Sequence, residues 1–285
     1  MGDYGMTIND MPQVPFGKYS ISRLIAGANP INGGSHLSRF VNAQMKRYYT
    51  KERVIEHLNQ CQQHGINVWQ TNPANLDLYR MHQEQGEEMH LISLGWDVEE
   101  DPKMLDNLAS VGTIGIAHHG EHTDTFFKNG QIDRVREYCK RVRDTGTMVG
   151  VSTHMPDVIK HILNEGWDVD FFMCCVYQRH RTREELMKLM GQVPIPIPEV
   201  YLEGDPARMF EVIRQTDKTC LAFKILAAGR LCEQQETVEE AFKRTFQQIK
   251  TNDAVIIGMY TEYEDQVALN AQYVKKYSNL SGLTI

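Results

Sequence analysis

Residues 148–175, MVGVSTHMPDVIKHILNEGWDVDFFMCC, decide the fold of this chain. Two short apolar runs, Met148–Ser152 and Asp170–Cys175, flank a segment, Pro156–Glu165, in which apolar residues recur every three to four positions. Short apolar runs are typical of buried strands, and the second spacing is typical of an amphipathic helix. The stretch therefore predicts a strand–helix–strand unit with parallel strands.

The same alternation runs along the whole chain. Strands are predicted at Leu24–Ala28, Ile66–Gln70, His90–Leu94, Thr113–Ala117, Met148–Ser152, Asp170–Cys175, Cys220–Lys224 and Ala254–Gly258. Helices are predicted at Lys51–His64, Arg80–Glu88, Met104–Ser110, Ile132–Thr145, Pro156–Glu165, Arg183–Met190, Pro206–Gln215, Val238–Lys250 and Glu262–Tyr277. About eight strands alternating with helices is the pattern of a closed (β/α)₈ TIM barrel, so we expect one α/β domain over residues 1–285.

Two stretches depart from this alternation. Residues 29–49 are rich in Gly, Asn and Ser and are predicted to form a long loop, and long loops in compact domains are often functional. Residues 193–204 contain Pro194, Pro196 and Pro198. Because proline donates no ladder hydrogen bond, this segment is predicted to be an extended crossing rather than an interior strand.

Composition narrows the range of partners. The formal net charge is −7, and no run is rich in Lys or Arg, which argues against a nucleic acid or an anionic membrane surface as partner. No stretch approaches the roughly 18 apolar residues of a membrane span. The six cysteines form no Cys-x-x-Cys pair, which is typical of reduced thiols. We expect a cytoplasmic protein with a small-molecule substrate, unless a processed leader has been removed; homo-oligomerisation stays open.

A cluster of polar side chains follows the fourth predicted strand. It consists of His118, His119, Glu121 and His122. Imidazole and carboxylate groups at the mouth of a buried strand point to metal ligation or proton transfer. Because side chains alternate along a strand, His118 and His119 are expected to face opposite sides.

Other strands also end in polar residues, and the carboxyl ends of barrel strands converge on one cavity. These residues are Asn29, Gln70, Asp97, His118, His154, Cys174 or Cys175, and Lys224. His118 and His154, with Glu121 or Cys175, would provide three ligands for a divalent metal such as zinc. Lys224 is interpreted as a base or Schiff-base amine, or else as an ion-pair partner of Glu199, Glu203 or Asp97.

The loop after the sixth predicted strand offers a further binding group. Tyr177 and Arg179 lie in a segment that also contains His180 and Arg181. A tyrosine and an arginine at a strand end would bind a substrate carboxylate or sugar hydroxyls. The alternative is a solvated basic loop.

Several segments together resemble the aldo-keto reductases. They are GKYSISRL at 17–24, GVSTH at 150–154, LAFKILAAGRL at 221–231, VIIGM at 255–259 and QVALNA at 266–271, and they follow the family's order. The resemblance implies a barrel that opens with a hairpin and first strand at residues 17–28. It also implies that His118 is the inward-facing catalytic histidine and that Phe223 and Gly258 contact a nicotinamide cofactor.

The chain departs from this family at the other catalytic positions. The family's aspartate and tyrosine are matched by Gln70 and Asn75, and its lysine by Gly95 or Trp96. Tyr79 is the remaining candidate acid. After the eighth predicted strand no Lys or Arg is present for a 2′-phosphate, and Thr261 with Glu264 is predicted to form a capping box that occupies the free N–H groups of the next helix. NADP is therefore disfavoured, and NAD somewhat less so.

Three functional hypotheses follow. The favoured one is a divergent aldo-keto-reductase-like enzyme that acts on a small polar substrate, a class that includes carbohydrate-like compounds. It would use metal-assisted or histidine-based acid–base chemistry, as a lyase, isomerase or hydrolase. Its reacting groups would be His118, His154 and Lys224, and Asn29 and Gln70 would orient the substrate. The first alternative is an NAD(P)H-dependent oxidoreductase with a rearranged proton donor. The second is a non-catalytic binding protein on the barrel scaffold.

Overall fold

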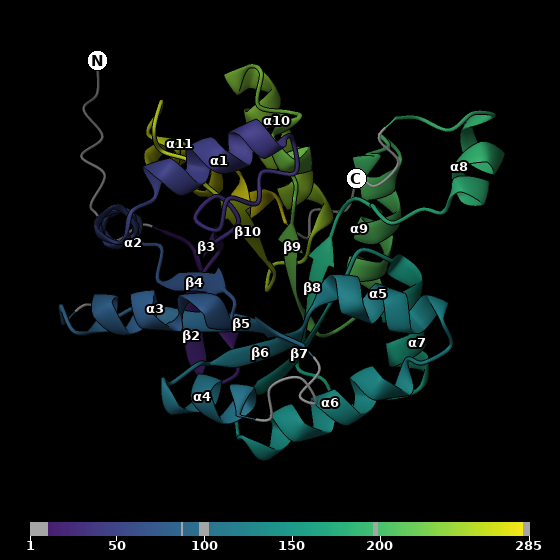
Figure 1. Ribbon diagram of the computed structural model, residues 1–285, viewed down its shortest axis with the longest axis horizontal. Coiled ribbons are helices and arrows are strands. Elements are labelled where there is room, and N and C mark those ends of the chain that lie inside the picture. The colour runs from purple at the N-terminus through teal and green to yellow at the C-terminus, as the bar shows by residue number, and fades with distance from the viewer. Residues whose placement is uncertain (1–10, 87, 97–102, 196–198, 282–285) are drawn as a thin grey trace.

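A closed barrel of eight parallel strands forms the centre of the computed structural model, which describes residues 11–86, 88–96, 103–195 and 199–281 (Figure 1). The barrel strands are β3 (Leu24–Gly27), β4 (Val68–Thr71), β5 (His90–Gly95), β6 (Gly115–His118), β7 (Met148–Thr153), β8 (Phe171–Cys175), β9 (Thr219–Phe223) and β10 (Ala254–Gly258). Each strand pairs with the next one along the chain, and β10 closes the ring against β3. The predicted TIM barrel is confirmed, and every predicted strand overlaps one of these.

Helices enclose the ring of strands. They are α1 (Arg39–Tyr48), α2 (Lys51–Gln63), α3 (Leu76–Gln83), α4 (Met104–Ser110), α5 (Gly120–Lys128), α6 (Asp133–Asp144), α7 (Pro156–Asn164), α8 (Arg183–Met190), α9 (Asp205–Gln215), α10 (Gln235–Gln248) and α11 (Gln266–Tyr277). Short 3₁₀ turns are η1 (Pro73–Asn75), η3 (Ala227–Gly229) and η4 (Ser278–Leu280). In Figure 1, α8 stands apart from the helices that cover the barrel.

Two of these helices were not predicted from the sequence. The second half of the expected loop at residues 29–49 is helix α1, so that prediction is wrong there. The Ser38 side chain accepts a hydrogen bond from the backbone N–H of Val41 and thereby caps the helix. Helix α5 begins at Gly120, inside the histidine cluster, and lacks a side-chain cap.

Two apolar layers fix which side chains face into the barrel. The inner layer contains Ile25, Val68, Ile92, Ala117 and Leu221, whereas the outer layer joins the opposite faces of the strands to the helices. A hairpin of β1 (Gln13–Phe16) and β2 (Tyr19–Ser22) adds Phe16 to the inner layer, where its ring lies 4.9 Å from that of Phe171. Because this hairpin covers the amino-terminal end of the barrel, the carboxyl end is the open one.

The structure describes part of the segment at residues 193–204, which is predicted to be an extended crossing. Residues 193–195 and 199–204 form neither α-helix nor β-strand, and residues 196–198 lie outside the described part of the chain. Separately, none of the helices that the structure describes is both long enough and apolar enough to cross a membrane.

Candidate functional site

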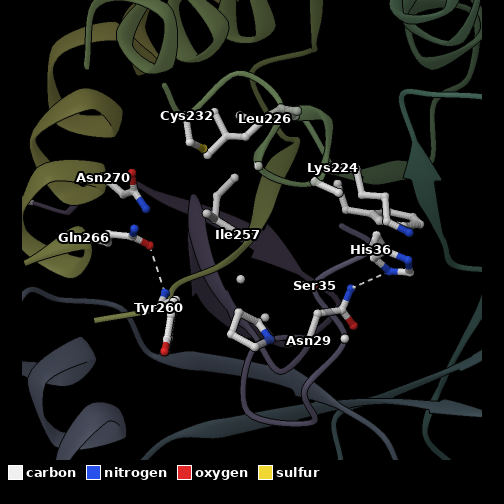
Figure 2. A pocket seen from close by; sticks show the side chains of 18 of the residues that line it. Asn29, Ser35, His36, Lys224, Leu226, Cys232, Ile257, Tyr260, Gln266 and Asn270 are labelled. Atoms are coloured by element: carbon white, nitrogen blue, oxygen red, sulfur yellow. Dashed lines mark hydrogen bonds between the residues drawn. The ribbon is translucent and has the colours of Figure 1, made fainter. Parts of the chain in front are cut away.

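A cavity of about 300 Å³ opens at the carboxyl ends of β9, β10, β3 and β4 (Figure 2). Five residues predicted to bind or react line it: Asn29, Gln70, Phe223, Lys224 and Gly258. From these the cavity extends to Cys232 in the loop before α10, and to Gln266 and Asn270 on α11. A cavity of this size suits a small organic ligand.

Lys224 is the one Lys or Arg side chain that lines this cavity among the described residues. It follows the last residue of β9, is half-buried, and places its Nζ 5.6 Å from the centre of the Phe223 ring. Among the described residues it forms neither a hydrogen bond nor an ion pair, so the predicted pairing with Glu199 or Glu203 is absent. Loss of hydration on burial is the largest effect on the pKa of Lys224, and the nearby charge of Arg179 lowers this pKa further. Glu199 and the Cys175 thiol oppose these effects only partly, so the pKa falls to about 8.

Backbone strain is concentrated around the same cavity. Within the described ranges, the non-glycine residues with positive φ are His36 (57°), Lys224 (60°), Ala227 (49°) and Ala228 (52°). Three of them line the cavity, and Ala227 belongs to the 3₁₀ turn at its edge. A left-handed residue other than glycine costs roughly 1–2 kcal/mol, and such strain persists where the surrounding structure enforces it, often at functional sites.

His36 is a functional candidate that the sequence did not reveal. Its Nδ1 lies 3.2 Å from Oε1 of Glu199, which in turn accepts a hydrogen bond from Nη2 of Arg179 at 2.6 Å. The Asn29 amide nitrogen lies 3.5 Å from Nε2 of His36. An amide nitrogen only donates, and a carboxylate only accepts. His36 therefore carries its proton on Nδ1, and its Nε2 lone pair faces the Asn29 amide at 3.5 Å beside the cavity.

The charges around His36 favour this neutral form. Burial lowers the pKa of His36, and Lys224 and Arg179 lower it further, against the hydrogen bond to Glu199. Burial opposes ionisation of Glu199, but its hydrogen bonds to His36 and Arg179 outweigh this effect and lower its pKa to about 2. At neutral pH the cluster therefore holds a carboxylate, a guanidinium and a neutral imidazole.

His154 is held by a second carboxylate, Asp124 of α5, which sequence reasoning also missed. Oδ2 of Asp124 lies 2.8 Å from Nδ1 of His154 and accepts the backbone N–H of His154 at 3.1 Å, and the Thr153 hydroxyl donates to Oδ1. Burial raises the pKa of Asp124 to about 6 and lowers that of His154 well below its usual range. The His154 ring packs 5.8 Å from that of Phe223 and, among the described residues, is not part of the cavity lining.

The predicted orientation of His118 is wrong. Ile116 belongs to the outer apolar layer and Ala117 to the inner one, so His118 points outward. Its Nδ1 lies 2.7 Å from the Thr123 hydroxyl, and its ring packs 4.9 Å from that of Tyr138 on α6. His118 therefore does not share a site with His154.

The residues predicted to bind a metal do not fit one. Because His118 faces the helices, it cannot join His154, and Glu121 is exposed on α5. Burial raises the pKa of the Cys175 thiol to about 11, which disfavours the thiolate that a metal requires. In the described part of the chain, no three His, Cys, Asp or Glu side chains are grouped so as to hold a metal ion.

The remaining predicted site residues are placed as follows. Arg179 donates a hydrogen bond to the Glu199 carboxylate. The buried Tyr177 packs against Tyr201, with ring centres 5.2 Å apart. Asp97 lies outside the described residues. Arg179 thus supports the cavity-lining His36 through Glu199, and neither Arg179 nor Tyr177 lines the cavity within the described ranges.

Two predictions about the reductase alternative are also wrong. The Tyr79 hydroxyl donates to the carbonyl oxygen of Met89 at 2.8 Å and is buried there, so it is not an acid in the cavity. Helix α11 begins at Gln266 and is capped by Asp265, whose side chain accepts from the N–H of Ala268; the capping box of Thr261 and Glu264 does not form. The Asp265 carboxylate therefore lies at the N-terminus of α11, in place of the predicted Thr261 and Glu264 cap.

No family model matches the sequence, and no curated protein matches it. The fold resembles solved structures that differ in function. A glycerol dehydrogenase from Gluconobacter oxydans has a TM-score of 0.55 at 13% identity, with 96% of this chain and 95% of that chain covered. An aldo/keto reductase from Brucella melitensis has a TM-score of 0.52 at 12% identity, with 96% of this chain and 95% of that chain covered. A truncated 3-deoxy-D-arabino-heptulosonate 7-phosphate synthase from Thermotoga maritima has a TM-score of 0.53 at 12% identity, with 95% of this chain and 92% of that chain covered. At such identities the likeness shows the TIM-barrel fold alone.

Proposed function

We propose that this protein is an enzyme that moves protons on a small polar substrate, held in the cavity with a carbonyl group near Lys224. The supporting observation is that His36 and Lys224 line one cavity in left-handed backbone conformations. Left-handed conformations at non-glycine residues cost free energy and are concentrated at active sites and ligand-binding sites. The reaction class is isomerisation or lyase chemistry that begins at a carbon next to a carbonyl.

Each group has a role that follows from its bonding. His36 has an unprotonated Nε2, which accepts the substrate proton once the substrate replaces its 3.5 Å contact with Asn29, while the Glu199 carboxylate stabilises the imidazolium that forms. Lys224, which has no carboxylate partner among the described residues, stabilises negative charge that develops on the substrate oxygen. The Gln70 amide nitrogen donates to the carbonyl of Thr71 at 2.9 Å, so its oxygen is left to accept a substrate hydroxyl.

Solvent exchange tests this proposal without knowledge of the product. The protein is incubated in D₂O with dihydroxyacetone, glyceraldehyde, glycolaldehyde and pyruvate, and loss of each C–H signal next to the carbonyl is followed by proton NMR. We expect catalysed exchange with at least one compound and a loss of 10²-fold or more in His36→Asn, because asparagine tolerates the left-handed backbone but is no base. Equal exchange in His36→Asn and the unaltered protein would exclude His36 as the base.

Hydride transfer with a nicotinamide nucleotide is the second candidate. It is favoured by the resemblance of the sequence to aldo-keto reductases and by the cavity's extension along the ends of β9 and β10, where Phe223 and Gly258 would contact the cofactor. With Tyr79 engaged elsewhere, Lys224 is a candidate acid among the side chains that line the cavity. Asp265 and the neighbouring Glu264 favour NAD over NADP. Titration with NADH, followed by energy transfer from tryptophan, tests this candidate.

A further inference from the structure

We propose that Lys224 forms an imine with an aldehyde or ketone ligand in the cavity. This inference rests on the proposed function and deepens it, because an iminium is a stronger electron sink for proton removal than a carbonyl beside a cation. The supporting geometry is an amine that lines a cavity with the Phe223 ring beside it and no carboxylate bound to it within the described ranges.

Lys250 provides an internal comparison. Its Nζ lies 2.9 Å from Oδ1 of Asp253 and donates to the carbonyl of Ile213 at 2.8 Å. Burial alone would lower the pKa of Lys250, but the Cys220 thiol and Asp253 raise it. Lys250 is thus a structural ammonium, whereas Lys224, which is also half-buried, has no such partners in the described part of the chain. Only an amine without a bound carboxylate is ready to lose its proton.

The surroundings of Lys224 favour the neutral amine. Burial is the largest effect on its pKa, and Arg179 adds repulsion; Glu199, Glu121 and the Cys175 thiol act in the opposite direction. With a pKa of about 8, the uncharged fraction of Lys224 at pH 7.5 exceeds that of an ordinary lysine on the order of 100-fold. Imine formation requires this uncharged form.

His36 supplies the proton transfer that imine formation needs. Both side chains lie at the same wall of the cavity (Figure 2), and the charge of Lys224 lowers the pKa of His36. Nε2 of His36 takes one proton from the Lys224 ammonium. The free amine then attacks the carbonyl carbon, a C–N bond forms, and one N–H proton passes to the former carbonyl oxygen to give a carbinolamine.

Loss of water completes the step. His36 returns its proton to the carbinolamine hydroxyl, which leaves as water while the nitrogen lone pair forms the C=N bond. An ammonium and a carbonyl thereby become an iminium and one water, and no further reactant is needed. Because His36 ends neutral, it is ready to accept a proton from the carbon next to the iminium.

Borohydride trapping tests the imine. The full chain is incubated at pH 7.5 with glycolaldehyde or pyruvate and sodium cyanoborohydride, and the initial rate of adduct formation at each lysine is measured by peptide mass spectrometry. We expect Lys224 to be labelled at least tenfold faster than every other lysine with one of the probes. Lys224→Arg keeps the charge and should lose this fast labelling, whereas Lys250→Arg should retain it.

The outcomes separate this inference from the proposed function. Labelling of Lys224 at the rate of surface lysines overturns the imine, and if deuterium exchange still occurs, the proposed function stands with Lys224 as a simple cation. Fast labelling of Lys224 without deuterium exchange for any probe supports the imine and counts against the proposed function. If circular dichroism shows that Lys224→Arg does not fold, the test is the pH dependence of the labelling rate in the unaltered protein. A labelling rate of Lys224 that reaches a plateau above about pH 8 supports the imine. A labelling rate that rises with pH in parallel with that of surface lysines overturns it.

Discussion

Oδ2 of Asp124 lies 2.8 Å from Nδ1 of His154 and joins helix α5 to the end of β7. The same carboxylate accepts hydrogen bonds from the Thr153 hydroxyl and from the backbone N–H of His154. Three donors thus converge on one buried carboxylate, and both of its oxygens accept hydrogen bonds. This junction fixes the ring that packs against Phe223 and thus supports one wall of the cavity.

Asp124→Asn should weaken this junction. An amide offers one acceptor oxygen instead of two and turns an NH₂ group toward the remaining donors. Hydrogen bonds to a charged group contribute about 1.5–3 kcal/mol each, so we expect a loss of about 2–4 kcal/mol in the free energy of unfolding, measured by urea denaturation. The exposed Asp157→Asn is the control and should change it by less than about 0.5 kcal/mol.

The pH dependence of stability is expected to have a contribution from His57. Burial lowers the pKa of His57 to about 4, whereas the unfolded value is 6.5. Between these values the unfolded chain binds a proton that the folded chain does not, so stability falls as the pH drops from 6.5 to 4. Over this range His57 contributes a loss of about 3 kcal/mol.

His57→Leu should remove that contribution. The difference in unfolding free energy between this variant and the unaltered protein is measured at pH 7 and at pH 4, so that all other titrating groups cancel. We expect this difference to shift by about 3 kcal/mol in favour of the variant at pH 4. A constant difference across the range would mean that His57 titrates alike in the folded and unfolded chains.

Parallel strands that are buried on both faces appear in a sequence as short apolar runs, which is why all eight barrel strands were predictable. The same property hid the orientation of β6. Ile114, Ile116 and Ala117 are all apolar, so nothing in the run shows which face is inner. The outward position of His118 depends on Ala117 entering the inner layer, and that is decided by packing across the barrel.

The cavity was partly predictable for a similar reason. Lys224 and Gln70 sit at or directly after strand ends, and strand ends of a barrel converge. His36 lies instead in a loop, and its partner Glu199 is 163 residues away in the sequence. A contact of that separation leaves no local pattern. Asp124 was missed because helix α5 was not expected. Without that helix, the sequence did not show that the Asp124 side chain faces His154.

Relief of strain at the cavity is expected to stabilise the fold. Ala228 has φ 52° and ψ 50°, a conformation that costs alanine about 1 kcal/mol relative to glycine. Ala228→Gly should therefore raise the unfolding free energy by roughly 1 kcal/mol. Ala109→Gly in helix α4 is the matched control and should lower it by about 1 kcal/mol. A loss of stability at both sites would mean that the left-handed turn imposes no strain at Ala228.

The ion pair of Arg181 and Asp205 is the last test, because both side chains are only 3% exposed. Nη1 of Arg181 donates to Oδ2 of Asp205 at 3.0 Å, and Nη2 bonds to Oδ1, so the pair is bidentate. Arg181→Met should cost about 3–5 kcal/mol, because it leaves the Asp205 carboxylate buried without its partner. Arg181→Met combined with Asp205→Asn should cost less than the sum of the single changes, by at least about 1 kcal/mol. Additive costs in this double-mutant cycle, measured by urea denaturation, would show that the two groups do not stabilise each other.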